Sequence, residues 1–503
     1  MSGRGGRRPG SSAGDGDLTD SGLATRASRG AAVTVLGQVM RIVVQAVGVT
    51  VLARLLEPDD FGLVAISVAI VGAGEIIRDF GLSMAAVQAA TLTQGQRSNL
   101  FWLNSGIGIV TMCLVFLAAW PIGAAFGDQR IVLVTQTLSV TFLFNGVGSQ
   151  FRAHLQRGLA FGWLALCEVA ALSIGVTAGI VAAVAGSGYW AIVVQQLTQT
   201  LTAVSILLLA ARWLPGRYRR QEPMGDLVRF GWHVMGYQFL TYASKNVDSL
   251  AIGAQFGPTP LGYYNRAFQL LTVPLNQLAN PMIRVAVAVL SRLRDDQARY
   301  SQYLYAGQVS LMSFMLTLLV GLVAFAEPFV NILLGSGWSG TVHLFQILSI
   351  AGIFQIASYP ILWAFMSEGL AKQNLQFSLI ARPLLIVMVV SGSFVSVDAV
   401  AWAYAGGTAL AWPLGLYWFS RSSTTPIARL AIHSVRSIAT FGIAGCFAHY
   451  AVRWAGIESD LLQCVTGGLI LLLVVALIGI LVRPVRRDLL LTAHVVRKFR
   501  KVK

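Results

Sequence analysis

The sequence predicts an all-α integral membrane protein with about 14 transmembrane helices, arranged as two parallel-repeat six-helix bundles around a central cavity plus two extra C-terminal helices. Hydrophobic residues make up 55% of the 503 residues and charged residues only 12%, against about 25% charged in soluble domains. Apolar runs recur from residue 31 to residue 482, and several approach the roughly 20 residues that cross a bilayer. The segments between these runs are too short to form a soluble domain.

The expected spans follow the apolar runs. A turn is expected near Gly335 at the end of the ninth span, and a different division of the third span around Pro121 is left open. The spans are 31–53, 61–87, 100–126, 130–150, 159–184, 188–211, 227–256, 261–290, 303–334, 341–367, 374–395, 397–420, 430–452 and 460–482.

This order of helices divides the chain into six regions. They are a disordered basic cytoplasmic tail (1–28), an N-terminal six-helix bundle (29–211), a cytoplasmic linker (212–226), a C-terminal six-helix bundle (227–420), extra helices 13 and 14 (421–482) and a basic cytoplasmic tail (483–503). The last tail mixes Leu489, Leu490 and Phe499 with basic residues. Two interpretations stay open for it, an amphipathic helix on an anionic membrane surface or a solvated tail.

The two bundles are predicted to be repeats. VLARLLEPDDFGLV from Val51 aligns with AIGAQFGPTPLGYY from Ala251, so that Pro58 matches Pro258 and Gly62 matches Gly262 at an offset of 200 residues. Six helices is an even number, so both bundles enter the membrane from the same side and the repeat is parallel. We expect the Pro and Gly motifs to form hairpin turns on the outer face, without a chemical role.

The distribution of basic residues predicts the orientation. With the N-terminus in the cytoplasm, 28 of the 37 Lys and Arg fall on the cytoplasmic side, three in external loops and six within spans. Because cytoplasmic loops collect Lys and Arg, both termini are expected in the cytoplasm. The same rule explains the net charge of +16 without nucleic acid, for which the sequence holds no binding module.

Basic residues inside the spans predict a cationic cavity. A charge at the centre of a membrane helix costs roughly 2.5–3.5 kcal/mol and therefore usually faces protein or water. Arginine also forms two parallel hydrogen bonds to phosphate. The candidate phosphate-binding residues are Arg41, Arg78, Lys245, Arg266 and Arg284.

Polar residues at helical spacing accompany these charges on three of the expected spans. Spacings of three, four and seven residues place each set on one face of its helix. Lipid does not satisfy such groups, so these faces are expected to line a wet cleft or to contact one another. The candidate polar lining residues are Gln38, Gln45, Gln238, Tyr242, Gln269, Asn276 and Asn280.

Acidic residues leave an alternative open. Glu75, Arg78 and Asp79 could neutralise one another within their helix, as could Lys245 and Asp248. Asp79 and Asp248 are alternatively candidates for coupling to Na⁺ or H⁺, since carboxylates in membranes often act as relays. No cofactor or metal is expected, because the His and Cys residues lack metal-site spacing.

Three motifs carry a resemblance to a known family. ARLLEPDDFGLVAI (53–66), IRDFGLSMAAVQ (77–88) and GYYNRAFQLLTVPLNQLANPM (262–282) resemble the polysaccharide-repeat-unit, Wzx-type flippases of the multidrug/oligosaccharidyl-lipid/polysaccharide transporter superfamily. The resemblance implies a bacterial cytoplasmic membrane protein. It would move a polyprenyl-phosphate- or diphosphate-linked oligosaccharide from the inner to the outer leaflet by alternating access, for cell-surface polysaccharide assembly. In related flippases basic cavity residues contact the phosphate; only Arg78 and Arg266 lie inside matching motifs here.

The resemblance also implies partners and rivals. The partners are the lipid-linked glycan, membrane lipids, a polysaccharide polymerase and glycosyltransferases. A lipid II flippase differs only in headgroup, and a multidrug antiporter often carries cations, which a basic cavity would repel. A membrane glycosyltransferase or polymerase is disfavoured, because no loop is large enough to hold a sugar donor. We therefore expect a transporter and not an enzyme.

Overall fold

The computed structural model describes residues 20–501 except 89–91, 159 and 424. Within these ranges the regular structure is helical and contains no β-strand, as the sequence predicts. The first half holds α1 (Asp20–Leu55), α2 (Pro58–Asp79), α3 (Leu82–Gln88), α4 (Gln94–Phe126), α5 (Arg130–Arg157), α6 (Phe161–Val184) and α7 (Trp190–Ala211). The second half holds α8 (Gly225–Phe256), α9 (Pro258–Arg292), α10 (Gln297–Ala324), α11 (Ala326–Leu333), η1 (Ser336–Trp338), α12 (Ser339–Ser367), α13 (Ala371–Ser393) and α14 (Val397–Ser420). It is followed by α15 (Ile427–Trp454), α16 (Asp460–Leu481) and α17 (Arg483–Lys501).

Twelve helices among the described residues are long and apolar enough to span a membrane. Two helices counted as spans in the sequence, α8 and α14, are not among them. Lys245 and Asp248 lower the hydropathy of α8, and Gly, Tyr and Trp residues lower that of α14. The number of 14 spans therefore stays a prediction, whereas the multi-pass membrane architecture is confirmed.

The structure changes three predicted boundaries. α1 begins at Asp20, inside the stretch expected to be a disordered tail, and the rest of that tail (1–19) lies outside the described residues. The expected span 61–87 is broken after α2, because Phe80 and Gly81 adopt positive φ values of 47° and 65°. The expected span 303–334 is two helices, α10 and α11, which are separated at Phe325.

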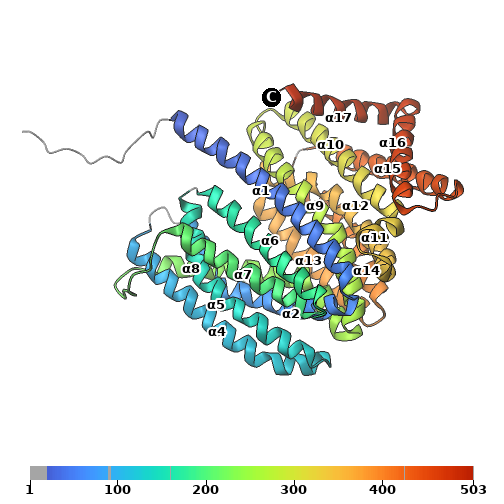
Figure 1. Ribbon diagram of the computed structural model, residues 1–503. Coiled ribbons are helices and arrows are strands. Elements are labelled where there is room, and N and C mark those ends of the chain that lie inside the picture. The colour runs from blue at the N-terminus through green and yellow to red at the C-terminus, as the bar shows by residue number, and fades with distance from the viewer. Residues whose placement is uncertain (1–19, 89–91, 159, 424, 502–503) are drawn as a thin grey trace, which may run out of the picture.

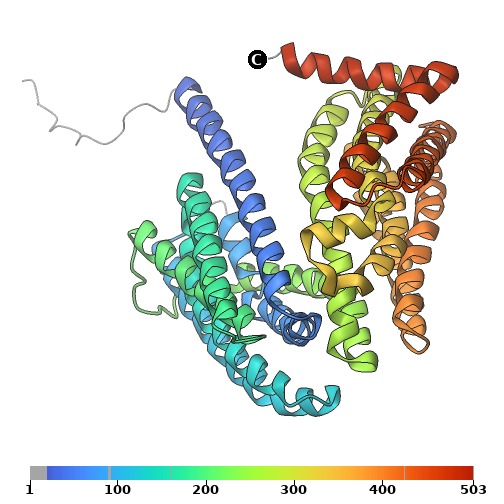
Figure 2. The same cartoon turned by 45° about the vertical axis from the view of Figure 1, so that its right-hand side comes forward.

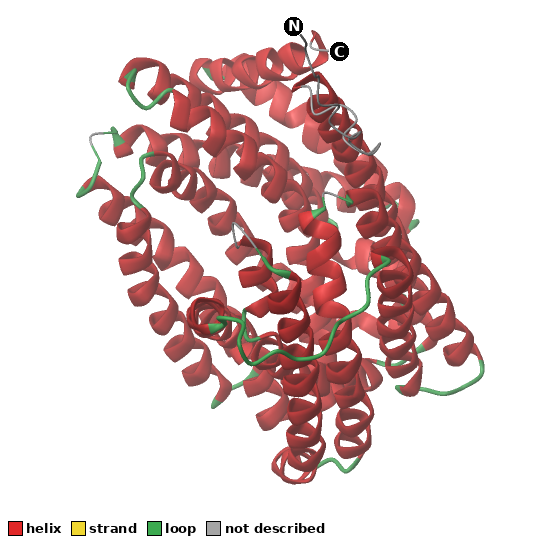
Figure 3. Cartoon of the chain, turned by 90° about the vertical axis from the view of Figure 1, so that its left-hand side faces the viewer, coloured by secondary structure: helices red, strands yellow, loops and turns green. Residues whose placement is uncertain are grey.

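The helices form two groups that meet at one end of the molecule. Figure 2 shows α4–α7, in cyan to green, on one side and α9–α16 on the other, with α1 running between them. α2 packs against α9 and α8, and α8 also contacts α3 and α13, so α8 bridges the groups. The start of α1 and the end of α17 lie at the end where the groups diverge (Figure 2), which is the upper end in Figure 3.

The two matching motifs meet where the groups join. Pro58 and Pro258 both lie in the first turn of their helices, α2 and α9. A Cβ atom on Gly62 would lie 1.7 Å from the carbonyl oxygen of Pro258, and one on Gly262 would lie 2.0 Å from that of Pro58. Because glycine has no Cβ atom, each glycine lets the backbone of the other motif approach more closely than any other residue would. The sequence motif was expected to serve only as a turn, so this reciprocal contact is an additional role.

Helices α15, α16 and α17 pack on one side of helices α10–α14. α15 contacts α10, α16 contacts α15 and α11, and α17 lies across α10 and α16 at the upper edge of Figure 1. The C-terminal stretch is therefore a helix docked on the protein, at least over its described residues. It is not an extended solvated tail.

Candidate functional site

A cavity of about 720 Å³ lies between α1, α6, α7 and α9, with contributions from α2 and α5. Four of the residues predicted from the sequence line it, and these are Arg41, Gln45, Arg266 and Gln269. The first two come from the first half of the chain and the last two from the second. The cavity is thus built where the two halves of the chain approach each other.

Three charged side chains form a chain of ion pairs on the wall from the first half. The Nη1 atom of Arg41 lies 3.2 Å from Glu168 Oε2, and that of Arg152 lies 3.4 Å from Glu168 Oε1. All three side chains are more than one-third exposed, so solvent screens the pairs and they add little to stability. Glu168 is not among the candidate site residues selected from the sequence. One carboxylate here faces two guanidinium groups, which leaves the wall positively charged.

Arg266 supplies charge from the opposite wall. Its guanidinium carbon lies 3.8 Å from the centroid of the Phe61 ring and 6.0 Å from that of Trp338, and Nη1 donates to Gln269 Oε1. Among the described residues no carboxylate lies within ion-pair distance of it. A cation over an aromatic face gains roughly 2 kcal/mol when desolvated. Aromatic contact therefore positions Arg266 but leaves its charge uncompensated.

Amide side chains complete the lining, and several of them come from α7. Gln195, Gln196, Gln199 and Thr200 all line the cavity, as does Asn145 of α5. Sequence reasoning did not select these residues. The signal was the run QQLTQTLT at 195–202, polar groups at helical spacing within an apolar helix. Amides donate and accept hydrogen bonds, so this wall suits a ligand with many hydroxyl groups.

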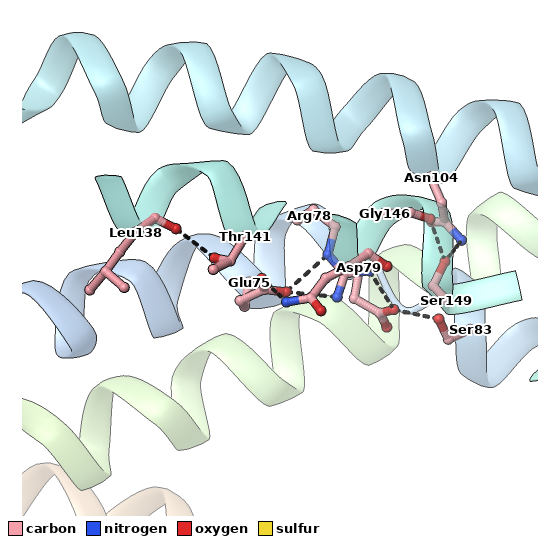
Figure 4. A network of polar contacts seen from close by, with 10 residues as sticks. Glu75, Arg78, Asp79, Ser83, Asn104, Leu138, Thr141, Gly146 and Ser149 are labelled. Atoms are coloured by element: carbon pink, nitrogen blue, oxygen red, sulfur yellow. Dashed lines mark hydrogen bonds and ion pairs between the residues drawn. The ribbon is translucent and has the colours of Figure 1, made fainter. Parts of the chain in front are cut away.

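Arg78 lies in a separate polar network beside the cavity (Figure 4). Its side chain is only 10% exposed, and Nη2 lies 2.7 Å from Glu75 Oε2 while Nη1 lies 3.6 Å from Asp79 Oδ1. Asn145 Nδ2 donates to Glu75 Oε1 at 2.7 Å, and Ser83 donates to Asp79. Two carboxylates thus enclose Arg78, which is the intrahelical neutralisation that the sequence left open. Asn145 links this network to the cavity.

Two further candidate residues join the halves without lining the cavity. Gln38 of α1 donates through Nε2 to Gln277 Oε1 of α9 at 2.6 Å. The Tyr242 hydroxyl of α8 donates to the Ala69 carbonyl of α2 at 2.9 Å and lies over Gly72. Both are contacts between the two halves of the chain.

The remaining candidates are dispersed. Lys245 on α8 and Asn276 and Asn280 on α9 are exposed, and Gln238 is half-buried. None of these four residues lines the cavity. The side chain of Arg284 lies outside the described residues.

Asp248 is buried near the start of α9. It is 3% exposed, and its Oδ2 accepts from the Tyr264 hydroxyl while its Oδ1 accepts from the Ser249 backbone N–H, both at 2.8 Å. The pairing with Lys245 that the spacing allowed is replaced by these bonds. Among the described residues no basic side chain lies within ion-pair distance of Asp248.

The end of the cavity nearest the junction is sealed. Phe61 lies 5.3 Å from Trp338 between ring centroids, and Trp338 Nε1 donates to the Ala53 carbonyl at 2.8 Å. Thr259 Oγ1 donates to Asp59 Oδ1 at 3.1 Å, directly beside the reciprocal Pro and Gly contacts. These bonds connect the first half of the chain with the second. The cavity is therefore closed at the end opposite to the chain termini.

Known proteins match both the sequence and the fold. The WzxC lipopolysaccharide biosynthesis protein of Escherichia coli is 27% identical over 72% of this chain and 74% of its own length. The teichuronic acid biosynthesis protein TuaB of Bacillus subtilis is 26% identical over 66% of this chain and 69% of its own length. The solved lipid II flippase MurJ, in an inward closed conformation, superposes with a TM-score of 0.69 at 13% identity, over 91% of this chain and 99% of that one.

A multidrug MATE transporter in an inward-facing conformation superposes with a TM-score of 0.54 at 12% identity, over 78% of this chain and 95% of its own. These two structures establish the fold, which is the one implied by the resemblance of the sequence motifs. The model of the family described as polysaccharide biosynthesis protein matches residues 51–343, more than half of the chain. The match includes all of α2 and α9 and every lining residue of the cavity except Arg41, Gln45, Gly48 and Val49. The chain therefore belongs to the polysaccharide biosynthesis protein family.

Proposed function

We propose that this protein is a flippase that moves a polyprenyl-(di)phosphate-linked oligosaccharide from the inner to the outer leaflet by alternating access. The relatives are named for lipopolysaccharide, teichuronic acid and succinoglycan biosynthesis, the last as a transport protein of Rhizobium meliloti. All three names refer to the biosynthesis of a polysaccharide or to its transport. A lipid-linked glycan is therefore the passenger class for this chain, and the activity is transport and not catalysis.

The observation that carries the proposal is the composition of the cavity. The lining holds three guanidinium groups and one carboxylate, beside a wall of glutamines. One guanidinium group can donate two parallel hydrogen bonds to the oxygens of a phosphate. Amide side chains can both donate hydrogen bonds to sugar hydroxyls and accept hydrogen bonds from them. The same excess of positive charge opposes a cationic drug, so a multidrug antiporter is the weaker candidate.

The orientation belongs to the proposal as well. The divergent end of the molecule carries the start of α1 and α17. Most Lys and Arg lie in the segments expected on this side, and positive loops face the cytoplasm. We place this end in the cytoplasm of a bacterial cell, with the sealed end outside. The inner-leaflet substrate would then enter through the open end, and a polymerase and glycosyltransferases would act before and after transport.

We propose that an ion gradient drives the cycle through Asp248, with Asp79 as a second candidate. Asp248 is buried, lacks a basic partner among the described residues and accepts a hydrogen bond from Tyr264 of α9. A proton or Na⁺ bound there would neutralise its charge. α8, which carries Asp248, contacts both groups of helices, so the ion would act on the element that connects them.

The proposal is tested with purified protein in proteoliposomes. A polyprenyl-diphosphate oligosaccharide with a fluorescent sugar is placed in both leaflets, and the fraction that external dithionite bleaches is followed. We expect bleaching to pass the outer-leaflet half in protein vesicles only. The control is an unphosphorylated polyprenyl glycan of the same sugars, which should stay protected. Equal movement of both lipids, or of neither, would contradict the proposal.

A further inference from the structure

A second, larger hollow lies away from the central cavity, at the end of the molecule that carries the termini. It measures about 1580 Å³ and is bounded by α10, α15 and α17. Five arginines line it, and we call this group the arginine pocket: Arg299, Arg429, Arg436, Arg483 and Arg487. None of its lining residues also lines the central cavity.

A buried carboxylate fixes one wall of the arginine pocket. Asp488 of α17 is 6% exposed, and its Oδ2 accepts from Arg436 Nε of α15 at 2.6 Å. His433 Nδ1 lies 3.5 Å from the other oxygen of Asp488. These contacts dock α17 on α15. Because Asp488 is paired with Arg436, its negative charge does not neutralise the remaining arginines.

Three of the other four arginines keep their charge available, whereas Arg299 pairs with Asp296, its Nε atom lying 3.3 Å from Asp296 Oδ2. Among the described residues, no carboxylate lies within ion-pair distance of Arg429, Arg483 or Arg487. Arg429 instead lies 6.0 Å from the ring centroid of Tyr305. All three side chains are exposed. Like charges that gather without acids favour an anion with several acceptor oxygens, and phosphate is the group that arginine recognises best.

The surroundings of the arginine pocket indicate that this phosphate belongs to a lipid. α10 and α15 are membrane spans, and the pocket is formed at their ends beside the start of α17. Apolar residues such as Leu293 and Leu491 share the lining. A smaller hollow of about 310 Å³ continues from Arg483 and Arg487 to Leu490, which is 60% exposed. Charge beside exposed apolar surface at this depth suits a headgroup together with its acyl chains.

We propose that the arginine pocket binds the phosphate of an anionic phospholipid from the leaflet at this end of the molecule, and that this lipid holds α17 against α10 and α15. A neutral or zwitterionic lipid lacks the net charge that the arginines require. The lipid is a second ligand beside the transported one, and its binding does not depend on the identity of the glycan.

The test uses the full chain purified in detergent. Phosphatidylglycerol or phosphatidylcholine with the same acyl chains is added, the bound lipid is counted by native mass spectrometry, and the thermal midpoint is measured. The variant is Arg429→Gln with Arg487→Gln. The matched control is Arg220→Gln with Lys372→Gln, which removes the same charge from exposed positions at the same end of the molecule. Arg436 is left intact because it anchors Asp488.

We expect phosphatidylglycerol to raise the midpoint of the parent and of the control, and the Arg429/Arg487 variant to lose at least half of that rise and its retained lipid. If that variant does not fold, Arg299→Gln with Arg483→Gln removes two other positive charges from the pocket, one on α10 and one on α17. Equal responses of all forms would overturn the proposal. So would an equal response to glycerol phosphate, which would indicate a soluble anion, or preferential retention of polyprenyl phosphate, which would make the pocket part of the transport path.

Discussion

Arg266 and Arg78 show how the surroundings of an arginine decide its role. Arg266 is held by an aromatic ring and an amide, both neutral, so its charge remains available to a ligand. Arg78 is enclosed by Glu75 and Asp79, so these two carboxylates neutralise its charge within the protein. Both lie inside the motifs that carried the family resemblance. Sequence identity at these positions could not separate the two roles, because the carboxylates act through local geometry.

Replacing Arg266 with Ala should strongly reduce transport without loss of protein. A hydrogen bond to a charged group contributes about 1.5–3 kcal/mol, so we expect transport in proteoliposomes to fall by at least about tenfold. Arg266→Lys should recover part of the rate, because it restores the charge but not the two parallel hydrogen bonds. Wild-type transport by Arg266→Ala at normal abundance would remove Arg266 from the site.

Replacing Arg78 with Ala should instead destabilise the protein. Two poorly exposed carboxylates would lose their partner, and removing one member of a buried ion pair costs about 3–5 kcal/mol. We expect a lower thermal midpoint by fluorescence-detected size exclusion. Arg220→Ala, at an exposed loop position, serves as the comparison. An unchanged midpoint together with lost transport would return Arg78 to the list of substrate ligands.

The lining residues of the cavity were only partly predictable. Helical spacing predicts four of them, Arg41, Gln45, Arg266 and Gln269. A polar face on an apolar membrane helix does not face lipid, so it faces a cavity or another helix. Glu168 and Arg152 lie on different helices, α6 and α5, so their pairing depends on tertiary packing. Lys245 fits the same stripe pattern yet is exposed outside the cavity lining, since spacing defines the face of a helix and not its neighbour.

At the scale of helices, the reciprocal contact of α2 and α9 forms the closed end. Gly62 and Gly262 are the points where the two backbones approach, and Asp59 with Thr259 adds a hydrogen bond beside them. Alternating access requires this contact to open and close. The offset of 200 residues was visible in the sequence. Two matching motifs do not show, however, that the helices that carry them pack against each other. The break at Phe80 and Gly81 was missed for a related reason, since the apolar run continues through it.

Replacing Gly62 with Val should hold the sealed end open. The new side chain would overlap the Pro258 carbonyl oxygen, since even a Cβ atom would lie 1.7 Å from it. We expect lost transport at normal abundance. In a variant lacking Cys113, Cys167, Cys446 and Cys464, a cysteine at Gln269 should react with an impermeant thiol reagent from the outside only when Gly62→Val is present.

Gly106→Val is the matched control for that change. No atom lies within 4 Å of a Cβ at Gly106 in α4, so transport and labelling should stay as in the parent. Equal external labelling at Gln269 with and without Gly62→Val would show that the α2–α9 contact does not seal the cavity.

At the scale of the whole molecule, the orientation follows from where the loops lie. The loop between α6 and α7 contains Gly188 and lies at the sealed end, where a Cβ atom on Gly188 would lie 3.4 Å from Asp60 Oδ1. The loop between α7 and α8 contains Arg219 and lies at the opposite end. A cysteine at Gly188 should react with an external impermeant reagent in intact cells, whereas one at Arg219 should react only after lysis. The opposite labelling pattern would invert the protein and, with it, the direction of transport.

The class and architecture of the molecule were the most predictable features, because composition and run length decide them before any packing is known. The positions of α8 and of α15–α17 were not, since these helices are placed by contacts between distant segments. α8 bridges the two groups of helices, and the arginine pocket arises only where α17 turns back over α10. Neither arrangement has a periodic signal in the sequence.

The central claim is that the anionic headgroup passes through the cavity between the two halves of the chain. The most direct measurement is photo-crosslinking with a polyprenyl-diphosphate oligosaccharide that carries a diazirine on its first sugar, followed by peptide mapping. We predict labelled peptides from α7 around Gln195–Thr200 and from α9 around Arg266–Gln269, with the labelling reduced by Arg266→Ala. Labelling confined to other helices, or unaffected by that substitution, would contradict the account.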